Sequence, residues 1–372
     1  MIDLTISNPT RCGFEYDANS VLGAFTAGNT LREALVYDPD PRGMRSARKA
    51  VVQYYADHGA TVDTDSLILT TSTSEAYSYL FRLLCDGGDE VLVAQPSYPL
   101  FEFLADLDDV RLKSYPLFYD YGWWIDFAEL ERRIGPRMRA ILVVHPNNPT
   151  GHWTHAPERE KLEALCEARG LALIVDEVFL DYPIDSSPSE LGSPKSFATG
   201  SNRALTFVLS GISKIAALPQ MKVAWIVPKG PQNAVEQALA RLEVIADTFL
   251  SMNAPAQLAL PGWLQGRKTI QRQIQARTQA NLATLRASGL EVLHLEAGWS
   301  AVVLLRGMSK NLAVVETLLE KAGVIVHPGE FYGLADNRIV VSLITPTGIF
   351  RLGVERICLA IGAGNLSSYV LR

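Results

Sequence analysis

The chain has 372 residues, with 34 Lys and Arg against 40 Asp and Glu, which gives a formal net charge of −6. This length predicts about two domains, and 48% hydrophobic with 20% charged residues is typical of a folded globular protein rather than a disordered one. The acidic balance argues against nucleic acid as the main partner, because phosphate binding needs a basic surface.

No membrane or export signal is visible in the sequence. No apolar run approaches the roughly 20 residues that cross a bilayer, and the N-terminus lacks the basic and long apolar segments of a signal peptide. Cys12, Cys85, Cys166 and Cys358 lie far apart without a C-x-x-C pair, which indicates reduced thiols rather than disulfides or a zinc site. We therefore expect a cytoplasmic protein with no membrane association.

Short apolar runs alternate with helical patterns over residues 67–226. Strands are expected at residues 67–70, 90–94, 110–115, 140–145, 171–176, 204–209 and 223–227, with helices such as 73–85 and 157–169 between them. Runs that are apolar on both faces, such as 141–144, suit strands covered by helices on both sides. The alternation predicts a mostly parallel, doubly wound sheet of seven strands.

The C-terminal part has a different pattern. A long polar helix is expected at residues 269–288, followed by strands at 291–294, 301–305, 324–327 and 339–343 and helices at 312–322 and 350–361. We predict an α/β protein with a large domain over residues 28–270 and a smaller α+β domain over residues 1–27 and 271–372.

Two polar residues follow neighbouring strands of the predicted sheet, where ligands of such sheets bind. In His145-Pro-Asn-Asn-Pro-Thr-Gly151, the amide of Asn148 could contact a ligand oxygen, or the segment is an ordinary Asn-Pro turn. Asp176 ends the next strand, where a carboxylate needs a partner such as a protonated ring nitrogen. The alternative for Asp176 is a helix N-cap.

Two lysines follow the next apolar run. Lys214, in Leu-Ser-Gly-Ile-Ser-Lys, would become a nucleophilic free amine if a site desolvated it. Lys222 could place a second cation near a phosphate. For both lysines, an ordinary solvated surface charge is the alternative.

Hydroxyl groups and an aromatic ring follow two earlier strands. Ser72, Thr73 and Ser74 stand at an expected helix start, where they either bind a phosphate or simply cap the helix. Tyr98 could stack on a flat cofactor or belong to the core. His152 and His155 share a loop with no third ligand in view, so no metal site is predicted.

The order of these motifs resembles that of the fold-type I, pyridoxal-phosphate-dependent aminotransferases of the aspartate-aminotransferase type. The resemblance covers residues 4–361. It implies the fold predicted above, pyridoxal 5'-phosphate as cofactor, and transfer of an amino group from an amino acid to a 2-oxo acid. The motifs run in the order Tyr37, Ser72-Thr73-Ser74, Pro96-Ser-Tyr98-Pro, Asn147-Asn148-Pro-Thr-Gly, Asp176, Ser213-Lys214 and Arg338.

The resemblance also implies roles for cofactor-binding residues. Lys214 would bind the cofactor covalently and carry the proton, Asp176 would pair with the pyridinium nitrogen, and Asn148 would donate to the phenolic oxygen. Tyr98 would stack on the ring. The phosphate would be held by Ser72, Thr73 and Ser74, with Tyr37 contributed by the second subunit of a homodimer with shared active sites.

On the substrate side, the resemblance implies that the planar guanidinium of Arg338 binds the α-carboxylate, with Asn148 and Asn8 bordering the substrate.

Three positions depart from the usual pattern. Phe179 stands where a tyrosine is usual, Gly211 where a phosphate-binding serine is common, and Lys222 where an arginine is customary.

Two alternatives to transamination remain at this point. A carbon–sulfur lyase or decarboxylase on the same fold would share Lys214 and Asp176, so the cofactor motifs do not separate it from a transaminase. A non-enzymatic regulator that binds the same cofactor would need a fused DNA-binding module, and no residues are left over for one.

Overall fold

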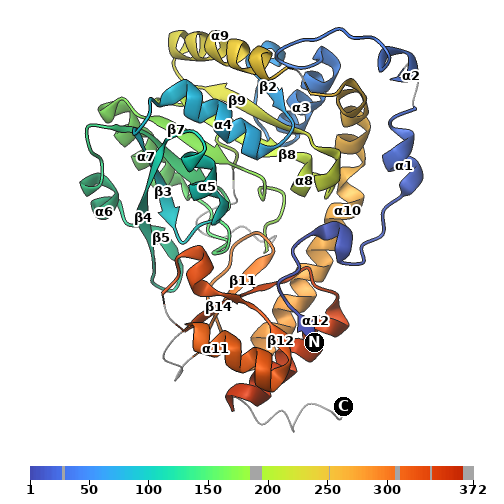
Figure 1. Cartoon of the computed structure of the whole chain (residues 1–372), viewed down its shortest axis with the longest axis vertical. Helices are drawn as coiled ribbons and strands as arrows, with labels where there is room; N and C mark the ends of the chain where they lie inside the picture. The colour runs from blue at the N-terminus through green and yellow to red at the C-terminus, as the bar shows by residue number, and fades with distance from the viewer. Residues whose placement is uncertain (27–29, 185–194, 251, 306–310, 336, 363–372) are drawn as a thin grey trace.

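The protein is described here from a computed structural model, which covers residues 1–26, 30–184, 195–250, 252–305, 311–335 and 337–362. Figure 1 shows a larger part built around one wide sheet and a smaller part near both chain ends, with the long helix α10 (Ala254–Ala287) running through both. This agrees with the predicted α/β fold with a second, smaller domain.

The wide sheet has eight strands in the order β2-β9-β8-β7-β6-β3-β4-β5. The pairs from β8 through β7, β6 and β3 to β4 are parallel, whereas β9 is antiparallel to both of its neighbours. The strands are β2 Ile68–Thr70, β3 Glu90–Gln95, β4 Arg111–Tyr119, β5 Trp123–Ile125, β6 Met138–Val144, β7 Ala172–Asp176, β8 Thr206–Gly211 and β9 Ala224–Lys229.

The seven predicted strands are all present, and β5 is an eighth that the sequence analysis missed. A turn closed by the hydrogen bond from the Asp120 amide to the Gly122 carbonyl folds β5 back onto β4 as an antiparallel hairpin. The run that forms β5 has only three residues, which is too short for a periodic pattern to reveal it.

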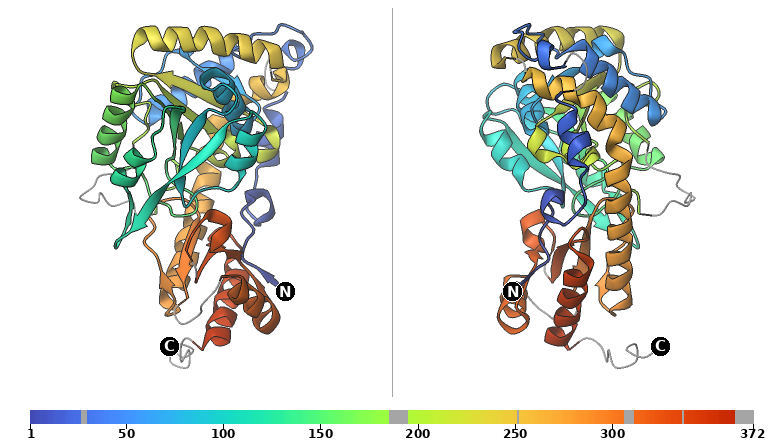
Figure 2. Two further views of the ribbon diagram at one scale, coloured as in Figure 1. Left: turned by 60° about the vertical axis from the view of Figure 1, so that its left-hand side comes forward. Right: turned by 90° about the vertical axis from the view of Figure 1, so that its right-hand side faces the viewer.

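Helices cover both faces of this sheet (Figure 2). Buried residues of α3 (Arg45–Asp57), α7 (Ala156–Arg169) and α10 pack on one face, and those of α4 (Thr73–Leu84), α5 (Leu100–Asp106) and α9 (Gln232–Phe249) pack on the other. Shorter helices are α1 (Ala18–Gly23), α2 (Thr30–Glu33), α6 (Phe127–Arg132) and α8 (Ile212–Ile215). Among the described residues, no helix has both the length and the apolar character needed to cross a membrane.

The smaller part is an α+β unit, as predicted. Its antiparallel sheet has the order β10-β11-β14-β13, and the N-terminal strand β1 (Ile2–Asp3) pairs in parallel with β12 (Val324–Ile325). Helices α11 (Asn311–Thr317) and α12 (Thr347–Ile361) belong to this unit. The sheet strands are β10 Glu291–Val292, β11 Ser300–Leu304, β13 His327–Pro328 and β14 Arg338–Ser342.

Helix α10 is much longer than the predicted helix at 269–288. Pro261 and two glycines discourage a helix over its first half, but burial outweighs that preference. Asn253 caps the helix, and the buried Trp263 donates its indole N–H to the Val21 carbonyl at 2.8 Å. The predicted boundary between residues 270 and 271 falls inside α10, so the domain limits stay a prediction.

The direction of the strands explains where the site lies. Strands β2 and β8 both run antiparallel to β9, so β2 has the same direction as the parallel strands β3, β6, β7 and β8. Their carboxyl ends therefore meet at one edge of the sheet, where ligands of open α/β sheets bind. The smaller part faces this edge in Figure 1.

The loop after β6 touches the smaller part at Gly151. This glycine has a φ of +68°, and its carbonyl accepts the Ala297 amide at 3.0 Å. A Cβ at Gly151 would overlap the Leu295 side chain and the Ala297 carbonyl oxygen. Gly170 has a similar φ of +64°, but nothing lies within 4 Å of its Cβ position.

These two glycines form a matched pair for a stability test. Gly170→Ala should cost about 1 kcal/mol in unfolding free energy, from the left-handed backbone alone. Gly151→Ala should cost about 2 kcal/mol more, because the overlap adds to the same backbone strain. Equal losses in denaturant unfolding would mean that the loop and the 295–297 segment are not held together as described.

Candidate active site

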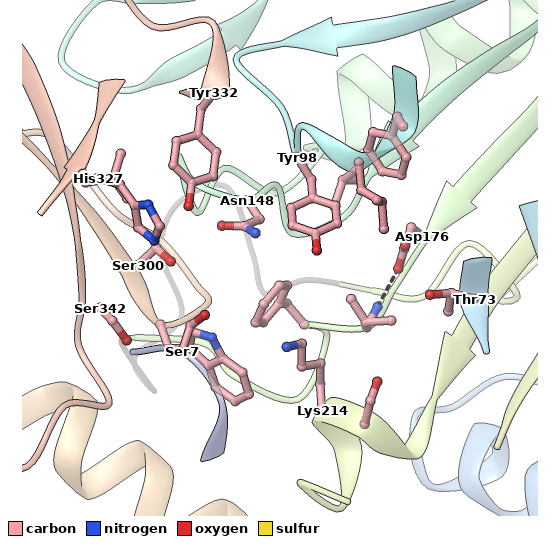
Figure 3. A pocket seen from close by; sticks show the side chains of 18 of the residues that line it. Ser7, Thr73, Tyr98, Asn148, Asp176, Lys214, Ser300, His327, Tyr332 and Ser342 are labelled. Atoms are coloured by element: carbon pink, nitrogen blue, oxygen red, sulfur yellow. Dashed lines mark hydrogen bonds between the residues drawn. The ribbon is translucent and has the colours of Figure 1, made fainter. Parts of the chain in front are cut away.

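A cavity of about 260 Å³ lies at the carboxyl edge of the wide sheet. Figure 3 shows side chains from both parts of the molecule pointing into it. Those from the larger part include Thr73, Ser74, Tyr77, Tyr98, Asn148, Asp176, Phe179, Ser213 and Lys214, and those from the smaller part and the N-terminal segment include Thr5, Ser7, Trp299, Ser300, His327, Tyr332 and Ser342.

Lys214 is the cation of this cavity. It lies in α8, directly after β8, and its Nζ is 4.9 Å from the ring centre of Trp299 and 5.5 Å from that of Phe179. Burial lowers the pKa of Lys214 to about 8, against the attraction of Asp176. About a tenth of the amine is therefore uncharged at pH 7, far more than for a solvated lysine, and only this form is nucleophilic.

Asp176 is the anion of the cavity and is only 5% exposed. Its carboxylate accepts the Tyr77 hydroxyl at 2.7 Å and the Val178 amide at 3.0 Å, the latter drawn as a dashed line in Figure 3. Burial raises the pKa of Asp176, while these two hydrogen bonds and Lys214 oppose the rise. The carboxylate is thus held in place in the wall of the cavity.

Tyr77 was not identified from the sequence. Its position did carry a signal, since it lies four residues after Thr73 and therefore on the same face of α4. Desolvation raises the pKa of the Tyr77 phenol well above its ordinary value, as does the nearby Asp176. The phenol therefore stays protonated and acts as a hydrogen-bond donor to Asp176.

The N-terminus of α4 opens into the cavity. Thr73 and Ser74 line it, whereas the Ser72 hydroxyl accepts the Glu75 amide at 3.1 Å as the N-cap. Backbone N–H groups and the positive end of the helix dipole favour an anion at such a position. This end of the cavity can therefore hold a phosphate.

Two of the departures from the family pattern concern residues expected to bind the phosphate, Gly211 and Lys222. At Gly211 a Cβ would come within 2.9 Å of both the Ala224 Cβ and the Val223 carbonyl oxygen, so the serine that is common there has no room. Lys222 is exposed, has a φ of 56°, and does not line the cavity.

Aromatic side chains and an amide complete the larger part's share of the cavity. Tyr98 and Asn148 both line it. Phe179 packs edge-to-face on Trp299, with ring centres 5.1 Å apart. Tyr182, three residues after Phe179, donates its hydroxyl to the backbone carbonyl of Lys214 at 2.6 Å.

Several residues singled out in the sequence lie outside the cavity lining. Tyr37 is 81% exposed. Asn8 is exposed and accepts the Thr10 amide at 3.1 Å as a cap. Arg338 begins β14, the strand whose Val340 and Ser342 do line the cavity. Their roles in cofactor and substrate binding stay predictions.

The wall contributed by the smaller part was largely missed. Ser300, His327, Tyr332 and Ser342 come from separate strands and a turn. No local motif marks them, because only the packing of the smaller part against the sheet edge brings them together. Burial lowers the pKa of His327, so its imidazole is neutral at neutral pH.

Comparison with known proteins identifies the family. Residues 22–354 match the family of class I and II aminotransferases, and the chain belongs to it. The arginine–pyruvate transaminase AruH of Pseudomonas aeruginosa is 28% identical over 345 residues, which is 91% of this chain and 84% of that protein. The glutamate–pyruvate aminotransferase AlaA of Escherichia coli strain K12 is 27% identical over 271 residues, which is 73% of this chain but only 65% of that protein.

Solved structures agree on the fold. Tyrosine aminotransferase from Leishmania infantum has a TM-score of 0.87 at 19% identity, covering 97% of this chain and 91% of that one. Alanine aminotransferase from Pyrococcus furiosus has a TM-score of 0.86 at 21% identity, covering 98% and 92%.

The depressed pKa of Lys214 predicts a pH effect on stability. The unfolded chain holds this proton up to about pH 10.5, but the folded cofactor-free protein holds it only to about pH 8. Between these values the unfolded state binds more protons, so the contribution of Lys214 to the unfolding free energy rises with pH.

Lys214→Met should remove this effect. The unfolding free energy of the cofactor-free wild type should gain on the order of 2 kcal/mol relative to Lys214→Met between pH 8 and pH 10.5. Denaturant unfolding of both proteins at several pH values measures the difference. Parallel curves would show that the amine is solvated and has an ordinary pKa.

Proposed function

We propose that the protein is a pyridoxal 5'-phosphate-dependent aminotransferase that moves an amino group from an amino acid to a 2-oxo acid. The observation that carries this proposal is one cavity that combines the depressed amine of Lys214, the buried carboxylate of Asp176 and the N-terminus of α4. Three relatives named as transaminases, two of them for pyruvate, support the same reaction.

The residues of the cavity fit this cofactor. Thr73, Ser74 and the first amides of α4 would bind the phosphate, with Ser72 holding the helix start. Asp176 would keep the ring nitrogen protonated. Asn148 would donate its amide to the phenolic oxygen, and Tyr98 would lie against the ring.

When bound, the cofactor supplies an electron-accepting ring that stabilises a carbanion at the substrate α-carbon. Lys214 Nζ would remove the α-proton of the substrate and hold it beside the reacting carbon. A base with a pKa of about 8 is well matched to this task near neutral pH. The aromatic rings of Phe179 and Trp299 beside Nζ keep water away from the amine.

The substrate would be held from the smaller part. We assign the binding of its α-carboxylate to Arg338, with Asn8 and Asn148 at the border of the site. The rest of the substrate would contact the polar wall formed by Ser300, His327 and Ser342. Pyruvate is the first 2-oxo acid to test, because relatives are named for it.

We further propose a cytoplasmic homodimer with shared sites and the domain division 28–270 against 1–27 and 271–372, joined by α10. The four cysteines are free thiols, which suits a reducing compartment. Tyr37 is exposed in the isolated chain and free to reach a partner's phosphate site. Lys222 and Phe179 would complete the cofactor site at its phosphate and phenolic ends.

Lys214 can be tested by chemical labelling. Borohydride reduction of the holoenzyme followed by peptide mapping should find the cofactor on Lys214. Among the lysines that the structure describes, only Lys214 lines the cavity, where its amine is desolvated. Lys214→Ala should lose turnover by several orders of magnitude, while Lys161→Ala, at an exposed lysine of α7 outside the cavity, should retain the covalent label.

The same preparation separates transamination from the alternatives. Incubation with a panel of amino acids should give the matching 2-oxo acid, with turnover only when an acceptor such as pyruvate is present. Continued turnover without an acceptor, with release of a thiol or carbon dioxide, would favour the lyase or decarboxylase instead. Label on another lysine would overturn the site assignment.

The shared site can be tested with hybrid dimers of Tyr37→Phe and Lys214→Ala protomers. If Tyr37 acts across the interface, both defects fall in one site and the other site is intact. Cofactor retention in Tyr37→Phe homodimers should weaken by about 2 kcal/mol, the value of a hydrogen bond to a charged group. Hybrids no more active than the mean of the two parents, or a monomeric protein, would refute the sharing.

A further inference from the structure

A second cluster of ionisable side chains lies outside the cavity just described. It consists of His152, His155, Glu158 and Glu296, none of which lines that cavity. The first two stand in the loop between β6 and α7, Glu158 is in the first turn of α7, and Glu296 precedes β11. His152, His155 and Glu158 are 3%, 4% and 6% exposed.

His152, His155 and Glu296 lie close enough together to bind one metal ion. One ligand atom each of His152, His155 and Glu296 lies within 4.8 Å of the other two. His152 Nδ1 is 3.4 Å from Glu296 Oε2, and His155 Nε2 is 2.8 Å from Glu296 Oε1. Ligands about 2.1 Å from a tetrahedral zinc ion are about 3.4 Å apart, so a small closure of the cluster would seat an ion.

Glu158 stands behind the two histidines. Its Oε2 is 3.1 Å from His152 Nε2 and 3.3 Å from His155 Nδ1, which are the nitrogens turned away from Glu296. Histidine ligands of metals usually donate their second N–H to such a carboxylate, which fixes the ring and its tautomer. Glu158 Oε2 lies within reach of one nitrogen of each ring, so a small rotation of the rings would let this one carboxylate support both.

Backbone amides hold both carboxylates in place. Glu158 accepts the Ile125 amide at 2.8 Å and the His155 amide at 3.0 Å, and Glu296 accepts the Trp153 amide at 3.2 Å. The carboxylates cannot turn away from the histidines without breaking these bonds. The cluster is thus pre-formed by the fold.

The protein groups alone leave this cluster poorly satisfied. Within the described residues, neither nitrogen of His152 makes a hydrogen bond of acceptable geometry, although carboxylate oxygens lie close to both. A buried imidazole without such bonds is costly. With a dication bound between neutral imidazoles, its two positive charges would balance the two negative charges of Glu158 and Glu296.

We propose that His152, His155 and Glu296 bind a divalent transition-metal ion of the zinc class, with Glu158 as the carboxylate that orients both histidines. Imidazole nitrogens with a carboxylate favour such an ion over magnesium or calcium, which prefer oxygen ligands alone. Sequence analysis found no third ligand because Glu296 is separated from His155 by 141 residues and reaches it only in the folded chain.

The ion would join the two parts of the molecule. The loop that carries His152 also carries Asn148, and the segment that carries Glu296 leads to Trp299 and Ser300, all three of which line the cavity. Gly151 and Ala297 already hydrogen-bond between these segments at 3.0 Å. The metal ion would therefore hold the two segments together beside the cavity and would take no part in the reaction itself.

Protons on the two histidines are the alternative to a metal ion in this cluster. Burial alone would lower the pKa of His155, but the nearby carboxylates of Glu158 and Glu296 outweigh burial and raise the pKa to about 9. Two imidazolium ions could then balance two carboxylates without any metal. Direct measurement of bound metal decides between the two arrangements.

The experiment uses the full-length holoenzyme without a histidine tag. Metal content is measured by mass spectrometry after purification from zinc-supplemented cells, and zinc affinity is then measured against a chromophoric chelator. The variants are His155→Gln and Glu296→Gln. His294→Gln is the matched control, because His294 is exposed and lies two residues from Glu296.

We expect about one zinc ion per wild-type and per control chain, and affinity reduced at least tenfold in both cluster variants. X-ray absorption at the zinc edge of the wild type should show two imidazoles, oxygen and no sulfur, a result that holds even if a variant fails to fold. Wild-type protein that binds no zinc at micromolar concentrations, cluster variants that bind it unchanged, or sulfur ligands would overturn the proposal.

Discussion

The site depends on a buried carboxylate that the fold keeps in one position. Asp176 is 5% exposed at the end of a central strand, an environment that disfavours its charge. The Tyr77 hydroxyl and the Val178 amide hold its two oxygens. What remains is a negative charge directed at the cavity, and a cationic partner such as a protonated ring nitrogen would compensate it.

The common direction of the strands brings the other groups to this carboxylate. Thr73, Tyr98, Asn148 and Lys214 each follow a strand that ends at the same edge of the sheet. The smaller part then closes the edge with Trp299 and its polar neighbours, which exclude water around the amine of Lys214. Neither part alone forms the cavity.

The fold and the larger part's share of the cavity were predictable from the sequence because both leave local patterns. Apolar runs marked every long strand, and Asp176, Lys214 and Asn148 each followed one of them. Features without a local pattern were missed. Helix α10 forms although its prolines and glycines disfavour a helix, because its side chains are buried against the rest of the protein. Tyr77, His327 and Glu296 reach their partners only through chain packing, so a single sequence gives no sign of those contacts.

The absorption spectrum of the purified holoenzyme, followed while single amino acids are added, tests transamination at this site most directly. One amino acid should convert the absorption of the bound cofactor to that of its amine form, and a 2-oxo acid added afterwards should restore the first spectrum. A spectrum that no amino acid changes, or one that returns to its starting form without any 2-oxo acid, would contradict an aminotransferase.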